Sequence, residues 1–192
     1  MGELRFDGGR VCLDLVATRV ARPVGERLDR PERVVEWIHG AGLVPPGTPV
    51  AAEAGWVRGL KELRTLLEAL VGAQLTGTPP PPEAVARLND VAQVPPLAPR
   101  AVLGEDGTLT RALAAPPDAG ALLAAVARDA VDLFTDPVAR SQLRRCEGEN
   151  CALVYLDTSR GRRRRWCSSE VCGNRERVAR HRRRTAPALR NA

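Results

Sequence analysis

The sequence predicts an α+β fold that is mainly α: a helical N-terminal domain with small β elements, followed by a small C-terminal module rich in cysteine and arginine. Three observations predict this organisation. Apolar residues recur at spacings of three and four along much of the N-terminal part, two close pairs of cysteines lie near the C-terminus, and the charge changes sharply between the two parts. We expect domains at 1–140 and 141–186, and a flexible tail at 187–192.

Helices account for most of the N-terminal part. The longest expected helix ends before Gly77 and carries an apolar stripe on one face. The four expected helices cover residues 31–39, 49–75, 83–91 and 118–134. The stripe of the longest one consists of Leu60, Leu63, Leu66, Leu67, Leu70 and Val71.

The remaining elements of the N-terminal part are short. Residues 5–9 favour a strand, and residues 10–20 favour a helix over a strand. Residues 101–110 predict a β-hairpin around a four-residue turn. Asp136 and Pro137 begin a short helix that is expected to run up to Cys146.

The charge is divided unevenly along the chain. Residues 1–143 carry 15 basic and 18 acidic side chains, whereas residues 144–192 carry 14 arginines and five acids. The resulting charges of −3 and +9 account for the net charge of +6. A slightly acidic body therefore precedes a strongly basic segment, and this segment is where a polyanion would bind.

Four of the five cysteines form two close pairs, Cys146 with Cys151 and Cys167 with Cys172, separated by fifteen residues. Two such pairs on tight turns supply the four thiolates of a structural tetrahedral zinc site. Disulfides are disfavoured in a reducing cytoplasm, whereas a redox role or an iron–sulfur cluster would use the same four thiolates. We expect one structural Zn²⁺, with no open position for catalysis. Cys12 is expected to be a small buried apolar residue.

The residues around the cysteines predict a treble-clef-like zinc ribbon. Residues 153–157 alternate as in a strand, residues 158–161 form a turn, and residues 162–166 are expected to return as a second strand. Residues 172–184 then form a helix. A module of this size buries little apolar surface, and zinc binding worth ~10–16 kcal/mol would stabilise it.

At the C-terminus, Trp166-Cys167 followed by Cys172-Gly173-Asn174-Arg175 resembles the CGNR zinc finger. The turn that begins Asp157-Thr-Ser159 and the lead-in Arg164-Arg165 match the same pattern. This resemblance assigns residues 141–186 to a CGNR-type finger.

The N-terminal stretches Phe6-Asp-Gly-Gly9 and Cys12-Leu-Asp14-Leu-Val16 resemble the ABATE domain, which usually precedes that finger. Ala17 stands where the pattern has Asn. The resemblance implies an ABATE-like domain over residues 1–140 and membership of a family regarded as stress-induced transcription regulators.

Arginine suits the recognition of nucleic acid, because its planar guanidinium binds phosphate in a bidentate manner and also reads guanine edges. A Zn(Cys)₄ centre carries a charge of −2, so one or two arginines are expected to neutralise it and others to pair with Glu170 or Glu176. Trp166 is expected as a wall of the small core, and Asn174 as a brace of the zinc turn. The expected nucleic-acid contacts are Arg160, Arg162, Arg163, Arg164, Arg165, Arg175, Arg177, Arg180, His181, Arg182, Arg183 and Arg184.

These features favour a zinc-dependent DNA-binding transcriptional regulator with double-stranded DNA as its partner. The N-terminal domain would either sense a small-molecule effector or form a homodimer. The alternative is a zinc ribbon that binds RNA or protein without sequence-specific DNA recognition. An enzyme is not expected, because the two histidines, His39 and His181, lie apart from any nucleophile, and Asp7 and Asp14 favour capping or ion-paired roles.

We expect a cytoplasmic protein that associates with the nucleoid when bound to DNA. The first residues include acids and lack the apolar run of a signal peptide. Apolar stretches also stay well short of the ~20 residues that a membrane span needs.

Overall fold

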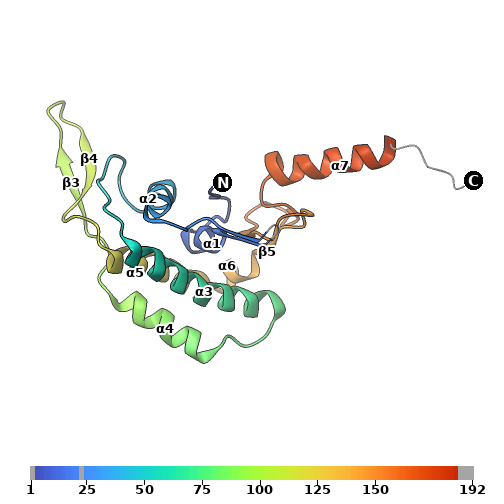
Figure 1. Cartoon of the computed structure of the whole chain (residues 1–192), viewed down its shortest axis with the longest axis horizontal. Helices are drawn as coiled ribbons and strands as arrows, with labels where there is room; N and C mark the ends of the chain where they lie inside the picture. Colours follow the sequence, from blue (N-terminus) through green and yellow to red (C-terminus); the bar gives the residue numbers. More distant parts are fainter. Residues whose placement is uncertain (1–2, 22–23, 186–192) are drawn as a thin grey trace, which may run out of the picture.

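The computed structural model describes residues 3–21 and 24–185, and the expected tail at 187–192 lies outside this part. A helical body leads into a small finger whose last helix points away from the body (Figure 1). The helices are α1 (Val11–Val16), α2 (Pro31–Gly40), α3 (Ala54–Thr76), α4 (Pro82–Gln93), α5 (Ala119–Thr135), α6 (Pro137–Ser141), the π-helical turn η1 (Ser169–Gly173) and α7 (Asn174–Thr185). The strands are β1 (Arg19–Ala21), β2 (Val24–Glu26), β3 (Pro99–Leu103), β4 (Leu109–Leu113), β5 (Leu143–Arg145) and β6 (Val154–Leu156).

Helix α3 is the centre of the body and packs against α1, α2, α4 and α5. Its predicted stripe faces the core, where all but the partly buried Leu66 are buried. The helix begins at Ala54, five residues later than expected, because Glu53 is still extended and accepts the first helical hydrogen bond from Trp56 N–H. It ends at Gly77, whose φ of 71° is left-handed and favours glycine.

The predicted helices in the rest of the body are confirmed. Helix α2 has proline in its first turn, and α5 begins where the Asp118 side chain accepts a hydrogen bond from Ala121 N–H at 2.9 Å. Helix α6 is shorter than expected, since residues after Gln142 enter strand β5 instead.

Of the two N-terminal expectations, the strand is wrong, and the helix is confirmed but shorter. Residues 5–9 do not form a strand, although the Gly8 carbonyl accepts one hydrogen bond from Leu156 N–H at 3.0 Å. Helix α1 stops at Val16, and the chain turns into β1, which pairs with β2. Thr18 marks this turn, because its hydroxyl donates to the Leu15 carbonyl at 2.6 Å and accepts from the buried Arg64 at 2.7 Å.

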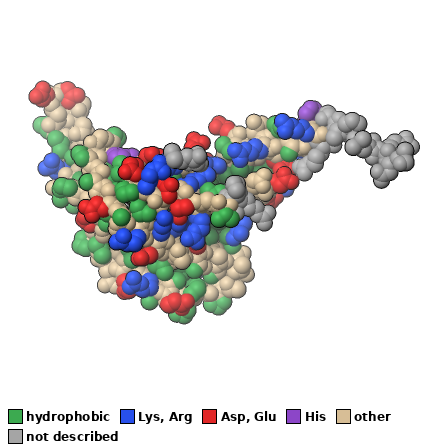
Figure 2. Space-filling model, viewed as in Figure 1, with side chains coloured by type: hydrophobic (Ala, Val, Ile, Leu, Met, Phe, Trp, Pro, Cys, Tyr) green, Lys and Arg blue, Asp and Glu red, His purple; other side chains and the backbone are tan. Residues whose placement is uncertain are grey.

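Strands β3 and β4 form the predicted hairpin, which is longer than expected and projects from the body (Figure 1). Leu103 and Leu109 face each other near its tip and are 69% and 72% exposed. Acidic side chains gather at this tip, far from the basic finger (Figure 2).

In the finger, strand β6 forms as expected, but its partner is β5 rather than residues 162–166. Among the described residues, no strand from the segment after β6 pairs with it, so the predicted hairpin does not form. Residues 162–166 form a loop, and Arg162 has a φ of 48° there, which is unusual for a residue other than glycine.

The hairpin β5–β6 is a wall shared by two cores. Leu143, Val154 and Leu156 face the core of the body, whereas Tyr155 faces the cysteine cluster. This alternation follows from the period of two along a strand. The finger is therefore packed onto the body through its own strands.

None of the described helices combines the length and the apolar composition that crossing a membrane requires.

Candidate metal centre and basic surface

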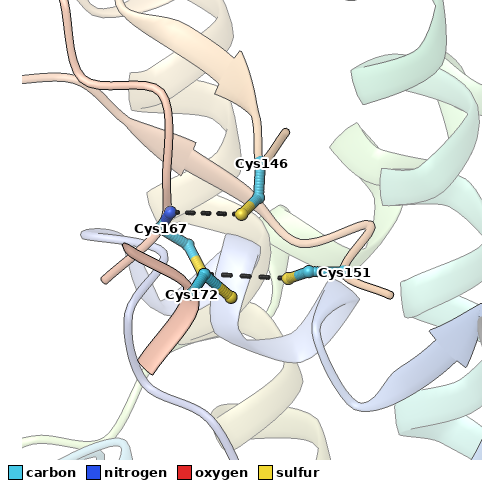
Figure 3. A group of neighbouring side chains, drawn as sticks. All are labelled: Cys146, Cys151, Cys167 and Cys172. Atoms are coloured by element: carbon cyan, nitrogen blue, oxygen red, sulfur yellow. Dashed lines mark hydrogen bonds between the residues drawn. The ribbon is translucent and has the colours of Figure 1, made fainter. Parts of the chain in front are cut away.

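The four paired cysteines come together although their elements are different. Cys146 follows β5, Cys151 precedes β6, Cys167 ends the arginine loop and Cys172 lies in η1. Their side chains point toward one another (Figure 3), and the four Sγ atoms lie within 4.8 Å of each other. Three of the cysteines are buried and Cys151 is half-buried.

The sulfur positions fit a tetrahedral zinc ion. A Zn–S distance of ~2.3 Å places neighbouring sulfurs about 3.8 Å apart, and the Sγ atom of Cys167 lies 3.8 Å from that of Cys151 and 3.5 Å from that of Cys172. The backbone N–H groups of Gly148 and Cys167 approach the Cys146 Sγ at 3.5 and 3.4 Å. Such donors stabilise thiolate charge. The expectation of one Zn²⁺ held by these four cysteines is confirmed.

The turn between Cys146 and Cys151 explains part of this geometry. Cys146 N–H donates to the Leu153 carbonyl and Cys151 N–H to the Gly148 carbonyl, both at 2.9 Å. Neither Gly148 nor Asn150 in this turn has a positive φ. A Cβ at Gly148 would lie 3.4 Å from the Cys151 Cβ and 3.5 Å from the Cys146 Sγ, which is ordinary van der Waals contact, so neither its backbone angles nor its surroundings require glycine here.

The thiols differ in acidity. The hydrogen bond between Cys151 and Cys167 lowers the pKa of Cys151 to about 5. The same hydrogen bond, together with burial, raises the pKa of Cys167. Burial raises the pKa of Cys172 to about 11. Zinc binding requires thiolates and therefore displaces the protons that remain on the other sulfurs. When bound, the ion supplies a structural crosslink.

One neighbour of the metal centre was missed by the sequence analysis. The Nη2 of Arg5 donates a hydrogen bond to the Cys167 Sγ at 3.5 Å, while its Nε pairs with Asp7 at 2.6 Å. The only sequence signal for a functional role of this segment was the resemblance of Phe6-Asp-Gly-Gly9 to the family pattern. Arg5 thus brings a cation from the N-terminal segment to a zinc ligand.

Asp157 organises the arginine loop from a buried position. Its Oδ1 accepts hydrogen bonds from the hydroxyl and N–H of Ser159, and its Oδ2 accepts from Arg164 N–H at 2.9 Å. The bond from the Ser159 hydroxyl is the main cause that holds the pKa of Asp157 below its usual range. The side chain therefore stays ionised and fixes the loop between the two cysteine pairs.

Several expected nucleic-acid contacts are engaged within the finger. The Arg164 guanidinium donates to the carbonyls of Trp166 and Cys167 and lies 4.6 Å from the centre of the Tyr155 ring. Arg165 pairs with Glu147 at 2.6 Å and stacks on Trp166. Arg162 reaches Ser141 Oγ at 3.4 Å and Arg177 reaches the Ser169 carbonyl at 3.3 Å.

The other expected contacts present a basic surface. Arg160, Arg163, Arg175 and Arg180 are exposed, and none has a hydrogen-bond or ion-pair partner among the described residues. His181 and Arg182 are also exposed on α7. Figure 2 shows arginine side chains over the finger and along α7. Arg183 and Arg184 belong to α7, but their side chains lie outside the described part.

Helix α7 continues directly from η1 and extends away from the body (Figure 1). Trp166 packs against the cysteine cluster, as expected for a wall of the small core. Ser168, rather than Asn174, caps η1 by accepting a hydrogen bond from Val171 N–H at 3.2 Å. Asn174 is exposed and its side chain has no hydrogen bond to another described residue.

The other residues singled out in the sequence have structural roles. Cys12 is buried, and its N–H donates to Asp129 Oδ2 at 2.9 Å. Asp7 is paired with Arg5, and Asp14 accepts a hydrogen bond from Gly8 N–H at 2.9 Å. Burial raises the pKa of Asp14 to about 7 despite this bond.

A cleft of about 920 Å³ separates the N-terminal part from the finger. It is lined on one side by residues of the N-terminal segment, β1, β2 and α3, and on the other by residues around Cys151 and Cys172. Ala17, which replaces the expected Asn, lies on this cleft and contacts the cysteine cluster.

Comparison with protein families agrees with this architecture. Residues 9–137 match the ABATE family, described as "Putative stress-induced transcription regulator", and residues 142–185 match the CGNR zinc finger. A comparison with curated proteins gave no match. The matched families are a regulator and a zinc finger, and neither is an enzyme family. The chain belongs to the ABATE family, and its C-terminal module is a CGNR zinc finger with a four-cysteine zinc site.

Proposed function

We propose that the protein is a zinc-dependent DNA-binding transcriptional regulator whose arginine-rich finger contacts the duplex. The observation that carries this proposal concerns α7, which extends away from the core (Figure 1). Apart from Val178 and Ala179, its described side chains are polar or charged. Packing usually supplies most of the stability of a helix in a protein. A basic helix with so little packing is suited to a partner that is itself a polyanion.

The dimensions of α7 suit the major groove. Its 12 residues span about 18 Å, and its diameter matches a groove ~12 Å wide. Arginines lie on several sides of the helix, so some can reach base edges while others contact phosphates on the groove walls. Arg175 and Arg180 are the best placed, because neither is engaged by another described residue.

The arginine loop would add contacts to the DNA backbone. Arg160 and Arg163 are exposed on it without internal partners in the described part of the chain. Arg162 is held at a left-handed φ, a conformation that costs an L-residue roughly 1 kcal/mol. Arg164 and Arg165 already have partners within the finger. We propose that they position the loop instead of binding DNA.

The proposal is tested by fluorescence anisotropy on random-sequence duplex DNA over a salt series. Neutralising six phosphates would give a slope of log K against log[salt] of about −5. Zinc removal by a chelator should abolish binding, because the loop and η1 are held together by the cysteines. Affinity that is independent of salt and zinc would refute the proposal.

The alternative is a ribbon that binds RNA or protein, and the same titration separates the candidates. Binding to structured RNA with at least the affinity for duplex DNA would favour an RNA module. A chain that binds neither nucleic acid would leave a protein partner.

We assign the regulatory role to the N-terminal domain, residues 1–140, and propose that the finger begins at residue 141. This domain would bind a small-molecule effector or form a homodimer, and the protein would act in the cytoplasm on the nucleoid. The cleft beside the zinc centre supports the effector role, since it has a volume of about 920 Å³ and its lining comes from both domains.

A further inference from the structure

The cleft between the N-terminal part and the finger contains an unsatisfied cation. Arg27 follows β2 and lines the cleft. Its Nε and Nη1 atoms are both buried, and neither has a hydrogen-bond partner among the described residues. A ligand in the cleft would therefore reach this guanidinium through its remaining nitrogen, Nη2. The described residues give the Arg27 guanidinium no acceptor, and an unpaired donor is unfavourable in a partly buried site, so this arrangement favours a bound acceptor.

The charges near Arg27 also favour a bound anion. Arg5 and Arg33 both lie close enough to repel it, and burial together with these two cations lowers the pKa of Arg27. Glu3 and Cys151 offset part of this repulsion. The positive charges gathered here repel one another. A bound anion would reduce this repulsion and would also supply the missing hydrogen-bond acceptor.

The other charged groups on the cleft are paired or exposed. Arg5 is paired with Asp7, and Arg19 is paired with Glu68 at 2.7 Å. The remaining charged groups on the lining are Glu3, Arg145, Glu170 and Arg175, all of them exposed. Arg27 is therefore the half-buried cation of the cleft whose own pairing is incomplete.

The rest of the lining is largely apolar. Phe6 and Val16 come from the N-terminal segment and α1, Val71 comes from α3, and Val171 comes from the finger. A small inorganic anion would leave these side chains without a partner. An organic anion with an apolar body would cover them and place its charged group on Arg27.

We infer that this cleft binds a small organic anion, whose carboxylate, phosphate or sulfonate head accepts hydrogen bonds from Arg27 while its apolar body lies between Phe6, Val71 and Val171. This inference deepens the proposed effector role of the N-terminal domain and rests on it. The ligand would contact both domains next to two zinc ligands, Cys151 and Cys172. Its binding would hold the finger in one position relative to the body.

A simpler role for Arg27 is to neutralise the zinc thiolates. Cys151 is one of the groups that act on it, yet no hydrogen bond joins the two. Arg5 does fill that role, because it donates to the Cys167 Sγ. Neutralisation alone would also leave the Arg27 guanidinium without a hydrogen-bond acceptor among the described residues.

The test uses the zinc-loaded full chain and the fluorescent anion 8-anilinonaphthalene-1-sulfonate, with the neutral probe N-phenyl-1-naphthylamine for comparison. We expect one saturable sulfonate site per chain and at least tenfold weaker binding in Arg27→Gln. Arg27→Lys should recover part of the affinity because it keeps the charge. Arg100→Gln, on the distant hairpin, is the matched control and should bind as the unmodified chain does.

A second measurement needs no variant and holds even if Arg27→Gln folds poorly. Octanoate should displace the bound sulfonate from the unmodified protein, whereas 1-octanol should displace it at least tenfold less well. Equal displacement by the two, equal affinity of Arg27→Gln and Arg100→Gln, or the absence of a saturable site would each overturn the inference.

DNA binding is measured on the same preparations, which separates the two failures. A chain that binds duplex DNA but fails the probe experiments overturns the anion site alone. A chain that passes the probe experiments without binding DNA overturns the proposed function alone.

Discussion

The guanidinium of Arg5 donates a hydrogen bond to the Sγ of Cys167, across 162 positions of sequence. This contact ties the first described residues of the body to a zinc ligand of the finger. Partners that donate to ligating atoms typically change metal affinity by 10–100-fold. The metal centre is therefore completed by both domains.

We predict that Arg5→Gln lowers zinc affinity about tenfold, because the Cys167 thiolate loses a charged donor. Competition with the chromogenic chelator 4-(2-pyridylazo)resorcinol measures this change. Arg19→Gln is the matched control, since Arg19 lines the same cleft but pairs with Glu68. Equal affinities in the two variants would show that the contact with Cys167 has no energetic role.

Cys167→Ser is expected to abolish stable zinc binding and to unfold the finger. Amides of residues 146–173 should lose their protection in hydrogen exchange measured by mass spectrometry. The helices α3, α4 and α5 should keep theirs, since most of the core of the body lies among them. Strand β5 and helix α1 should show intermediate protection, because they pack in the core of the body and also contact β6 of the finger. Simultaneous loss of protection in all helices would instead indicate one cooperative unit.

Arg164→Ala and Arg163→Ala should have opposite consequences. Arg164 loses two hydrogen bonds to carbonyl groups and its contact with Tyr155, so we expect its replacement to destabilise the finger by ~1–3 kcal/mol. Arg163→Ala should leave the stability within about 0.5 kcal/mol of the unmodified chain. It should weaken DNA binding for all sequences and reduce the salt slope by about 1. Urea unfolding and the salt titration distinguish the two variants, and a reversed pattern would refute the division of roles.

Asp14 should make the protein less stable as the pH rises. Its pKa is raised to about 7 in the folded chain, against ~3.9 in an unfolded one. Between these values the folded state holds a proton that the unfolded state has lost, so the free energy of unfolding falls with increasing pH through this window and levels off above it. Asp14→Asn keeps an acceptor for Gly8 N–H and should flatten this dependence. Thermal unfolding from pH 5 to pH 8 measures it, and parallel profiles for the two proteins would contradict the assignment.

Much of the architecture was predictable because its signals are local. The leucine stripe of α3, the proline at the start of α2 and the Asp118 cap of α5 depend on residues within one or two turns of each other. The spacing of the cysteine pairs is also a local signal, since each pair lies on one short turn. Spacing alone therefore indicated the zinc site, and the motif around Cys172 identified the finger.

The failures concern partners that lie far apart in the sequence. Residues 162–166 were expected to return as the second strand of a hairpin, but β6 pairs with β5, and Asp157 holds the arginine segment in a loop through Ser159 and Arg164. Thr18 ends α1 early because it meets Arg64 from α3. No local sequence pattern shows which segment will pair with β6 or which side chain will reach the Thr18 hydroxyl.

The sequence by itself determined the helical content, the four zinc ligands and the concentration of positive charge in the finger, because each depends on composition or on short spacings. Only the tertiary structure decided which arginines support the finger and which remain exposed, that Arg5 completes the metal centre, and that Arg27 lines a cleft without a full set of acceptors. These properties depend on distances between side chains on different elements, and such distances arise only when the elements pack.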